Sequence, residues 1–398
     1  MLNILALSVL PTMLLAPASV PTVPPTLTAE SAILIDDATG AVLFEKNSHE
    51  RKYPASTTKI MTALLLVEHC KMDDKITAPA DVKTVGESSI YLEPFEVLSV
   101  KDALYALMVR SANDVAYAVA CHISGTVEQF ADLMNKRATE LGCTETTFRN
   151  PHGLRNKDHM TSAHDLALIA REAMKHSEIR QACRTRRVLI ERSINQLNRY
   201  LVSKDRFLED PSAEGVKTGF TIPAGSCFVG AKRVNGWRLI TVVLKSGDWL
   251  GETKSLMDYG FAKFRQYRPL GEGADCGQVS VASGESNEVQ AVAGRTLSVV
   301  ANRGGYNREP KVELLKVNAP IRAGDIVGHA EATNIDGTTV RIPLFAANSV
   351  PLSSSPIATI RRAPFAALLT GIGSTAILLF GFALLRRRSH SPKKRQHA

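Results

Sequence analysis

Tyr53-Pro54-Ala55-Ser56-Thr57-Thr58-Lys59-Ile60-Met61-Thr62 is the stretch from which the fold and chemistry of this 398-residue chain can best be read. Apolar residues at three- and four-residue spacing from Lys59 to His69 predict a helix that starts near Ser56. The three-residue spacing puts Ser56 and Lys59 on one helical face, within hydrogen-bonding reach. A lysine amine among apolar neighbours can have its pKa lowered enough to deprotonate a serine. Alone the pattern is weak, because a capping serine beside a solvated lysine is commoner.

Two further motifs follow along the chain. Ser111 and Asn113 form an S-x-N pattern at a break between helical stretches, and Lys217-Thr218-Gly219 precedes strand-like residues. Neither motif is specific for a function by itself, since the first also fits a helix N-cap and the second also fits the edge of a hairpin. The ordered set S-x-x-K, S-x-N and K-T-G indicates a serine acyl-transfer site.

The patterning around these motifs predicts a mixed α/β fold. Residues 29–45 form two short strands around a turn at 37–40, helical patterns follow, and strands return near the K-T-G motif. An antiparallel sheet flanked by helices fits this order best. The helical patterns lie at Lys59–His69, Val100–His122, Val127–Leu141 and Ser162–His176, and the later strands at Gly215–Lys217, Ser226–Lys232 and Trp237–Leu244.

With its three motifs, the chain resembles the serine-type D-alanyl-D-alanine carboxypeptidases, the low-molecular-mass penicillin-binding proteins. The resemblance covers roughly residues 29–264 and implies the penicillin-binding fold, with a weaker architectural match beyond. Four stretches also carry it, namely Pro54-Ala55, Asn150-Pro151-His152-Gly153-Leu154, the run 160–167, and 215–221 followed by Ala224-Gly225. Within the second stretch, the Pro-His-Gly setting of His152 favours a structural role over a catalytic one.

The resemblance implies four catalytic residues. Ser56 would attack the carbonyl between the two D-alanines that end a peptidoglycan stem peptide, and Lys59 would be its base. Ser111 would relay a proton to the leaving D-alanine or to the nitrogen of a bound β-lactam antibiotic. Asn113 would hold Lys59 and the substrate amide. Water would then release the acyl-enzyme.

It also implies four residues that bind the substrate. Lys217 and Thr218 would take its terminal carboxylate, and Gly219 would let its backbone lie against the strand. The N–H groups of Phe220 and Ser56 would form the oxyanion hole. No metal or other cofactor is expected. Some relatives carry an arginine after the last strand, but this chain reads Gly247-Asp248-Trp249-Leu250 and shows no second cation there.

Other functions share these motifs. A β-lactamase needs a deacylating glutamate between S-x-N and K-T-G, and Glu172 and Glu178 lie in helix-like basic sequence without that pattern. A catalytically idle wall-binding scaffold would use the same cleft without turnover, although the intact motifs argue against it. Carboxypeptidase, endopeptidase and transpeptidase differ only in leaving group and acceptor. Carboxypeptidase is the main hypothesis.

Charge and hydropathy at the two ends predict export and anchoring. Leu2–Leu15 is mostly apolar and precedes Ala16-Pro17-Ala18, which is typical of a cleaved signal peptide, although no Lys or Arg precedes it. Phe365–Leu385 carries no charge and is followed by a basic tail, as expected of a membrane helix with a cytoplasmic tail. These features place the protein in the bacterial cell envelope, with its catalytic domain outside.

Most of the net charge of +9 therefore lies beside and after the predicted membrane helix, where it indicates the orientation of the chain in the membrane. Residues 361–398 hold eight basic residues and no acid, which leaves residues 1–360 nearly neutral, so nucleic acid is not an expected partner. The chain accordingly divides into a signal peptide (1–18), a proline-rich leader (19–28), the catalytic domain (29–267), a small all-β domain (268–348), a linker (349–364), a transmembrane helix (365–385) and a basic tail (386–398).

Six cysteines are scattered along the chain, at positions 70, 121, 143, 183, 227 and 276. They form no CxxC and have no histidines at metal-ligand spacing, so zinc is not expected. An exported chain could pair them as disulfides, whereas the apolar surroundings of several favour buried free thiols.

Overall fold

The computed structural model describes residues 23–354. Contacts divide the chain into two units, the first made of residues up to 269 with 298–309 and 332–340, the second of 270–297, 310–331 and the residues from 341 on. The predicted signal peptide, transmembrane helix and basic tail lie outside the described residues. Among residues 23–354, no helix combines the length and the apolar character needed to cross a membrane.

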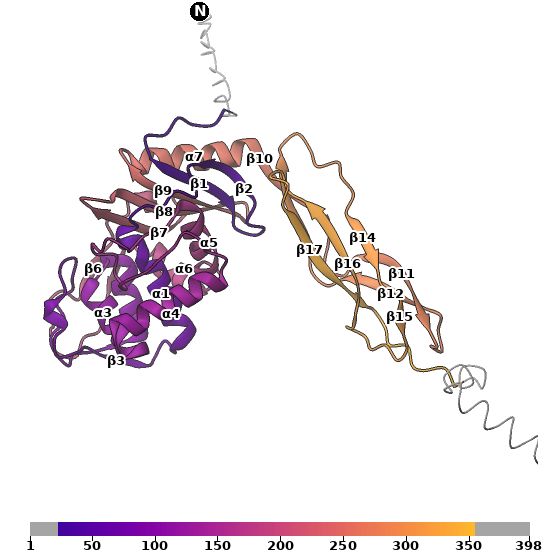
Figure 1. Ribbon diagram of the computed structural model, residues 1–398, viewed down its shortest axis with the longest axis horizontal. Coiled ribbons are helices and arrows are strands. Elements are labelled where there is room, and N and C mark those ends of the chain that lie inside the picture. Colours follow the sequence, from indigo (N-terminus) through magenta and orange to yellow (C-terminus); the bar gives the residue numbers. More distant parts are fainter. Residues whose placement is uncertain (1–22, 355–398) are drawn as a thin grey trace, which may run out of the picture. The chain divides into compact units, whose positions relative to one another are not determined.

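A five-stranded antiparallel sheet forms the centre of the first unit (Figure 1). Its strand order, β2-β1-β9-β8-β7, pairs the first strand of the domain with the last. The predicted antiparallel sheet flanked by helices is confirmed. The strands are β1 (Ser31–Asp36), β2 (Val42–Lys46), β7 (Ala213–Thr221), β8 (Gly225–Val234) and β9 (Trp237–Ser246).

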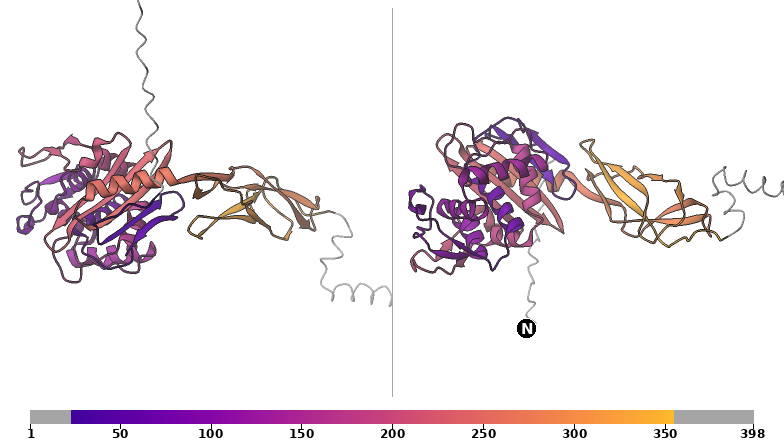
Figure 2. Two further views of the ribbon diagram at one scale, coloured as in Figure 1. Left: turned by 90° about the horizontal axis from the view of Figure 1, so that it is seen from above. Right: turned by 60° about the horizontal axis from the view of Figure 1, so that its bottom comes forward.

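Helices bury both faces of this sheet. Ile33 and Ile35 of β1 belong to the core shared with α1 (Lys59–His69), whereas Leu34 packs in the core of α7 (Trp249–Lys263). Successive side chains of a strand point to opposite faces, so β1, which is buried along its whole length, contributes to two cores. Figure 1 shows α7 along one side of the sheet and α1 with α5 on the other, and Figure 2 gives two further views.

The helical segment after residue 100 is interrupted. The predicted helical segment Val100–His122 is divided among α2 (Val100–Tyr105), the π-helical turn η3 (Ala106–Arg110) and α3 (Asn113–Ser124). Ser111, between η3 and α3, adopts a left-handed conformation (φ 64°). The predicted break at the S-x-N motif thus ends one helix and starts another. The remaining helices are α2 (Val100–Tyr105), α3 (Asn113–Ser124), α4 (Val127–Glu140), α5 (Ala163–Ala173) and α6 (Ser177–Arg184), with short turns η1 (Ala55–Thr58), η2 (Val82–Thr84), η3 (Ala106–Arg110) and η4 (Arg206–Glu209).

Two small hairpins complete the part of the chain before residue 264, and β strands make up the rest. The hairpins are β3 (Lys75–Thr77) with β4 (Val97–Ser99), and β5 (Arg187–Leu189) with β6 (Tyr200–Val202). A six-stranded sheet of order β14-β16-β17-β12-β11-β15 and a separate β10-β13 pair confirm the predicted β-rich C-terminal domain. Their strands are β10 (Phe264–Leu270), β11 (Asp275–Ala282), β12 (Glu288–Ala293), β13 (Leu297–Asn302), β14 (Lys311–Leu314), β15 (Val317–Asn318), β16 (Ile326–Thr333) and β17 (Thr339–Ala346).

Candidate active site

Ser56 lies in η1, the tight turn immediately before α1. Two threonines close this turn with their own hydroxyls: Thr57 Oγ1 donates to the Pro54 carbonyl at 2.7 Å and Thr58 Oγ1 donates to the Ala55 carbonyl at 2.8 Å. Ala55 has a positive φ of 48°, which non-glycine residues rarely adopt. Such strain is typical of functional sites, where surrounding contacts hold an unfavourable backbone.

Lys59 is completely buried beneath Ser56. Its Nζ lies 3.3 Å from Ser56 Oγ, and it donates to Asn113 Oδ1 at 2.6 Å and to the His152 carbonyl at 2.9 Å. Burial, together with the charge of nearby Lys217, holds the pKa of Lys59 well below its usual range, although Asp114 opposes this shift. The amine is therefore suited to accept a proton from the serine.

The S-x-N residues come to the same place from another part of the chain. The buried Ser111 hydroxyl has no hydrogen-bond partner among the described residues, so it is free to bind an incoming group. Asn113 begins α3, and its Nδ2 donates to the Gly86 and Glu87 carbonyls at 2.9 and 2.6 Å. These bonds fix the carboxamide with its oxygen toward Lys59, and a substrate amide would have to displace one of them.

The K-T-G residues lie on β7, the edge strand next to the nucleophile. Lys217 is 2% exposed, and its Nζ donates to the Thr218 carbonyl at 2.9 Å. Burial lowers the pKa of Lys217 to about 8, while Asp205 opposes the shift. A side chain at Gly219 would place its Cβ 3.1 Å from the backbone nitrogen of Ser56, a tight contact, so glycine favours the close approach of β7 to the turn η1.

A cavity of about 430 Å³ joins the three motifs. Its walls include six of the eight predicted site residues, while Lys59 and Asn113 form hydrogen bonds below its floor. Phe220 is 67% exposed and lines the cavity. Neither Glu172 nor Glu178 lines this cavity. The predicted residues in the wall are Ser56, Ser111, Lys217, Thr218, Gly219 and Phe220.

Two histidines support the turn that holds the nucleophile. His152 accepts from the Leu154 backbone N–H, and its carbonyl binds Lys59, which fits the structural role expected for it. His159 accepts from the Arg149 N–H at Nδ1, so its Nε2–H donates to Thr58 Oγ1 at 2.8 Å. Burial lowers the pKa of each ring to about 3, so both imidazoles are neutral.

Other residues of the cavity wall were not found from the sequence. Arg110 and Lys204 add positive charge besides Lys217, and Trp249 at the start of α7 also lines the cavity. Asp205 Oδ1 accepts from the Phe207 N–H at 2.8 Å, and Oδ2 has no hydrogen-bond partner among residues 23–354. Burial raises the pKa of this carboxyl to about 6. Arg110 directly precedes Ser111 of the S-x-N motif, whereas Lys204 and Asp205 lie in the segment before β7, which no motif marks.

All six cysteines lie within residues 23–354, and each is a free thiol. Cys183 and Cys227 line the cavity. Burial raises the pKa of Cys183 to about 12 and that of Cys227 to about 11. Neither thiol is therefore a competing nucleophile at neutral pH.

A serine next to a strained residue, a buried lysine base beneath it and a cationic edge strand beside it define a serine acyl-transfer enzyme. Residues 18–247 match the family model described as D-alanyl-D-alanine carboxypeptidase, and residues 264–352 match the C-terminal domain of penicillin-binding protein 5. The chain belongs to the D-alanyl-D-alanine carboxypeptidase family.

Individual relatives agree with the family match. The D-alanyl-D-alanine carboxypeptidase DacF of Bacillus subtilis is 33% identical over 75% of this chain and 80% of its own length. Penicillin-binding protein 5 of Haemophilus influenzae superposes with a TM-score of 0.71 at 27% identity, covering 83% of this chain and all of that one. The Streptomyces K15 DD-transpeptidase superposes with a TM-score of 0.57 at 29% identity, covering 60% of this chain and 99% of its own.

Proposed function

We propose that this protein removes the terminal D-alanine from peptidoglycan stem pentapeptides through an acyl-enzyme on Ser56. The observation that carries the proposal is the Ser56 hydroxyl 3.3 Å from the buried amine of Lys59, at the floor of a cavity with Lys217 in its wall. A neutral amine that close can take the hydroxyl proton as the oxygen attacks.

Acylation follows from the positions of three groups. Ser56 Oγ attacks the penultimate D-alanine carbonyl while Lys59 Nζ takes its proton. The proton then passes through the unpaired Ser111 hydroxyl to the departing amine nitrogen, so D-alanine leaves as a neutral amine and the serine ester remains. A β-lactam ring opens by the same step, but its amine stays tethered, which explains penicillin binding in chemical terms.

Substrate position depends on the edge strand. The ammonium of Lys217 and the hydroxyl of Thr218 bind the terminal carboxylate, and the cavity wall near them also carries Arg110 and Lys204. The substrate backbone lies along Gly219, where no side chain intervenes. The N–H groups of Ser56 and Phe220 stabilise the oxyanion.

Deacylation returns the enzyme to its starting state. Water attacks the ester carbonyl while Lys59 Nζ takes a water proton, and the ester oxygen leaves as the Ser56 hydroxyl after regaining a proton. An amine acceptor in place of water would give transpeptidation, and a cross-linked substrate would give endopeptidase activity. A scaffold without turnover would need none of the three motifs to be intact.

We extend the proposal to location and domain division. The uncharged stretch 365–385 between basic residues supports one membrane helix that holds the enzyme at the outer face of the cytoplasmic membrane. Residues 1–18 have the pattern of a signal peptide, and the domains divide at residues 267, 348 and 364 as set out from the sequence.

One experiment separates these activities. The purified full chain in detergent is incubated with a pentapeptide ending in D-Ala-D-Ala, with and without an amine acceptor, and separately with penicillin. We expect released D-alanine, no acceptor adduct, and a penicillin adduct on the Ser56 peptide that is lost in Ser56→Ala. Ser177→Ala, at an exposed serine, is the matched control. An unreacted Ser56 peptide or a dominant acceptor adduct contradicts the proposal.

A further inference from the structure

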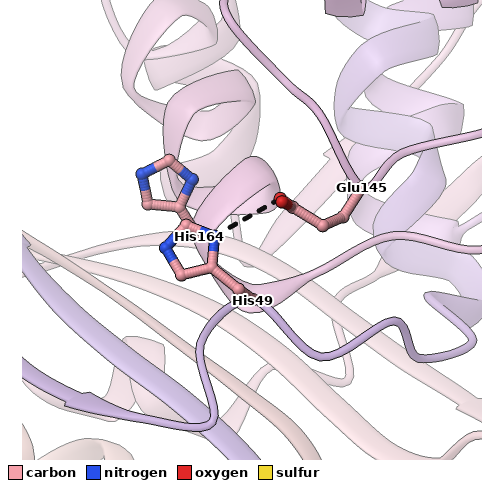
Figure 3. A group of neighbouring side chains, drawn as sticks. All are labelled: His49, Glu145 and His164. Carbon is pink, nitrogen blue, oxygen red and sulfur yellow. Dashed lines mark ion pairs between the residues drawn. The ribbon is translucent and has the colours of Figure 1, made fainter.

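Three side chains away from the serine site converge on the surface of the first unit. His49 follows β2, Glu145 lies between α4 and α5, and His164 is in the first turn of α5 (Figure 3). One potential ligand atom from each lies within 4.8 Å of the others. Two imidazoles and a carboxylate form a set that zinc enzymes and zinc sites commonly use.

The two imidazole rings lie against each other, as Figure 3 shows. Their centroids are 4.4 Å apart and their planes differ by 28°. His49 Nδ1 faces Glu145 Oε2 at 3.5 Å, and the dashed line in Figure 3 marks this pair. Two protonated rings this close would repel each other, whereas a shared cation would draw both nitrogens and the carboxylate together.

Outer partners of the kind that orient metal ligands are already in place. His164 Nδ1 lies 3.4 Å from the buried carboxylate of Asp165, which leaves Nε2 of His164 for a ligand. Glu145 Oε1 accepts from the Thr144 hydroxyl at 2.6 Å, and Oε2 from the Ser162 hydroxyl at 3.3 Å. Metal-binding histidines and carboxylates are usually held by such second hydrogen bonds.

The main chain holds the three segments together. The His164 N–H donates to the Ser48 carbonyl at 2.9 Å, next to His49. The Glu145 N–H donates to Asp165 Oδ2 at 2.8 Å, beside His164. Binding therefore requires only side-chain rotation, and the cost of ordering the backbone is already met.

We infer that His49, Glu145 and His164 bind a Zn²⁺ ion, with water as the fourth ligand. A tetrahedral ion with ligands at its usual distances brings their atoms to about 3.3 Å from each other. The side chain of His49 is 58% exposed, so it can rotate to close the remaining gap. The bound ion ties His49, in the segment after β2, to His164 in the first turn of α5. His164 lies three residues after Thr161, whose carbonyl accepts from the Lys52 N–H.

The test uses the full chain in detergent, stripped with EDTA and then titrated with ZnCl₂ or CoCl₂. We expect Zn²⁺ at about 100 times its dissociation constant to raise the thermal midpoint by roughly 5 °C or more. One equivalent of Co²⁺ should give the intense visible bands of a four-coordinate ion, without thiolate charge-transfer absorption.

Two variants and a matched control decide the assignment. His49→Gln changes the most exposed ligand, and Glu145→Gln keeps the shape of its side chain; each should weaken Zn²⁺ binding at least about tenfold and remove the midpoint shift. His122→Gln, at an exposed histidine of α3, should bind as the parent does. If Zn²⁺ leaves the thermal midpoint of the parent protein unchanged, the inference is overturned. Equal Zn²⁺ binding by all three variants also overturns it and would show adventitious metal binding only.

Discussion

Lys59 combines two properties that a surface lysine lacks. Its ammonium would be costly to keep in a dry interior, and the charge of Lys217 adds repulsion, so the pKa falls and the neutral amine becomes available. Asn113 Oδ1 and the His152 carbonyl accept from its nitrogen, and Ser56 Oγ lies 3.3 Å from it. The contacts that bury Lys59 therefore both lower its pKa and fix the position of its nitrogen.

Replacing this base should stop acylation while leaving the fold intact. Lys59→Met has a similar shape and no basic nitrogen, so we expect the rate of penicillin acylation to fall by about 10²- to 10⁴-fold. Stopped-flow acylation kinetics measure this, with circular dichroism as the fold check. Lys101→Met, at an exposed lysine of α2, is the control; acylation at the parent rate in Lys59→Met would exclude Lys59 as the base.

Lys217 should set the alkaline limit of activity. It must be charged to bind the carboxylate, and its pKa is lowered to about 8 by burial. Below that pH the ammonium is present, and above it the charge is lost, so kcat/KM should fall as pH rises through about 8. Lys59 acts as the neutral amine, so its titration limits the acid side instead.

A pH profile of kcat/KM with the pentapeptide checks this sign. Lys217→Arg keeps the charge at all relevant pH values and should remove the alkaline fall while raising KM through its altered geometry. A profile that falls in the same way in the arginine variant would show that another group sets the limit.

At the scale of elements, the turn at 150–154 packs against η1. Gly153 has φ 84°, and a Cβ there would lie 1.8 Å from the Ala55 carbonyl oxygen and 2.8 Å from Thr58 Oγ1. No side-chain rotation relieves a clash with main chain. The strained Ala55 conformation therefore depends on a glycine about a hundred residues away.

Gly153→Ala should accordingly damage both stability and activity. We expect the free energy of unfolding to fall by more than about 3 kcal/mol and acylation to be lost. Gly142→Ala is the matched control, since Gly142 has φ 85° but open space around its Cβ position, and it should cost about 1 kcal/mol. Urea unfolding of both variants provides the comparison; equal losses would mean that the positive φ, not the contact, decides the effect.

The loop between β3 and β4 depends on a buried ion pair. Arg192 and Glu96 meet at 2.7 Å with both side chains fully buried, and Arg192 also donates to the Ile90 and Tyr91 carbonyls. Removing one partner leaves the other charge buried alone. The same loop supplies the carbonyls of Gly86 and Glu87 that fix Asn113.

Arg192→Ala should lower the free energy of unfolding by about 3–5 kcal/mol. Arg206→Ala breaks an exposed pair with Glu209 at 3.9 Å and should cost less than about 1 kcal/mol. Denaturant titrations of the two variants measure the difference. A loss in Arg192→Ala no larger than in the control would mean that the loop is held by its other contacts.

For the whole molecule, the charge distribution predicts where the enzyme works. A chain that ends at residue 354 lacks the uncharged stretch 365–385 and the basic tail. We expect this truncated protein to leave the membrane fraction while its catalytic domain still forms the penicillin adduct. Fractionation with labelled penicillin measures both. Truncated protein that stays in the membrane fraction would locate the anchor elsewhere.

Much of the fold was predictable because it depends on local patterning. The helix at Lys59–His69 has the predicted bounds, and the hairpin turn at 37–40 joins β1 to β2. Helix α7 was missed, since Gly251 and Gly260 interrupt its apolar spacing. Gly260 packs closely against the sheet, since a Cβ there would lie 2.7 Å from side-chain atoms of Leu34 and Leu239, a contact that no local pattern reveals.

By itself, the sequence determined the three motifs, their order and the element on which each lies, because helix and strand periodicities act over a few residues. Only the tertiary structure decided what those residues can do. Burial makes Lys59 a base, the main chain of η1 packs closely against Gly219, and the folded chain brings Asp205 into the cavity. The same holds for His49, Glu145 and His164. Proximity and desolvation arise between segments that are distant in sequence, so no spacing rule along the chain predicts them.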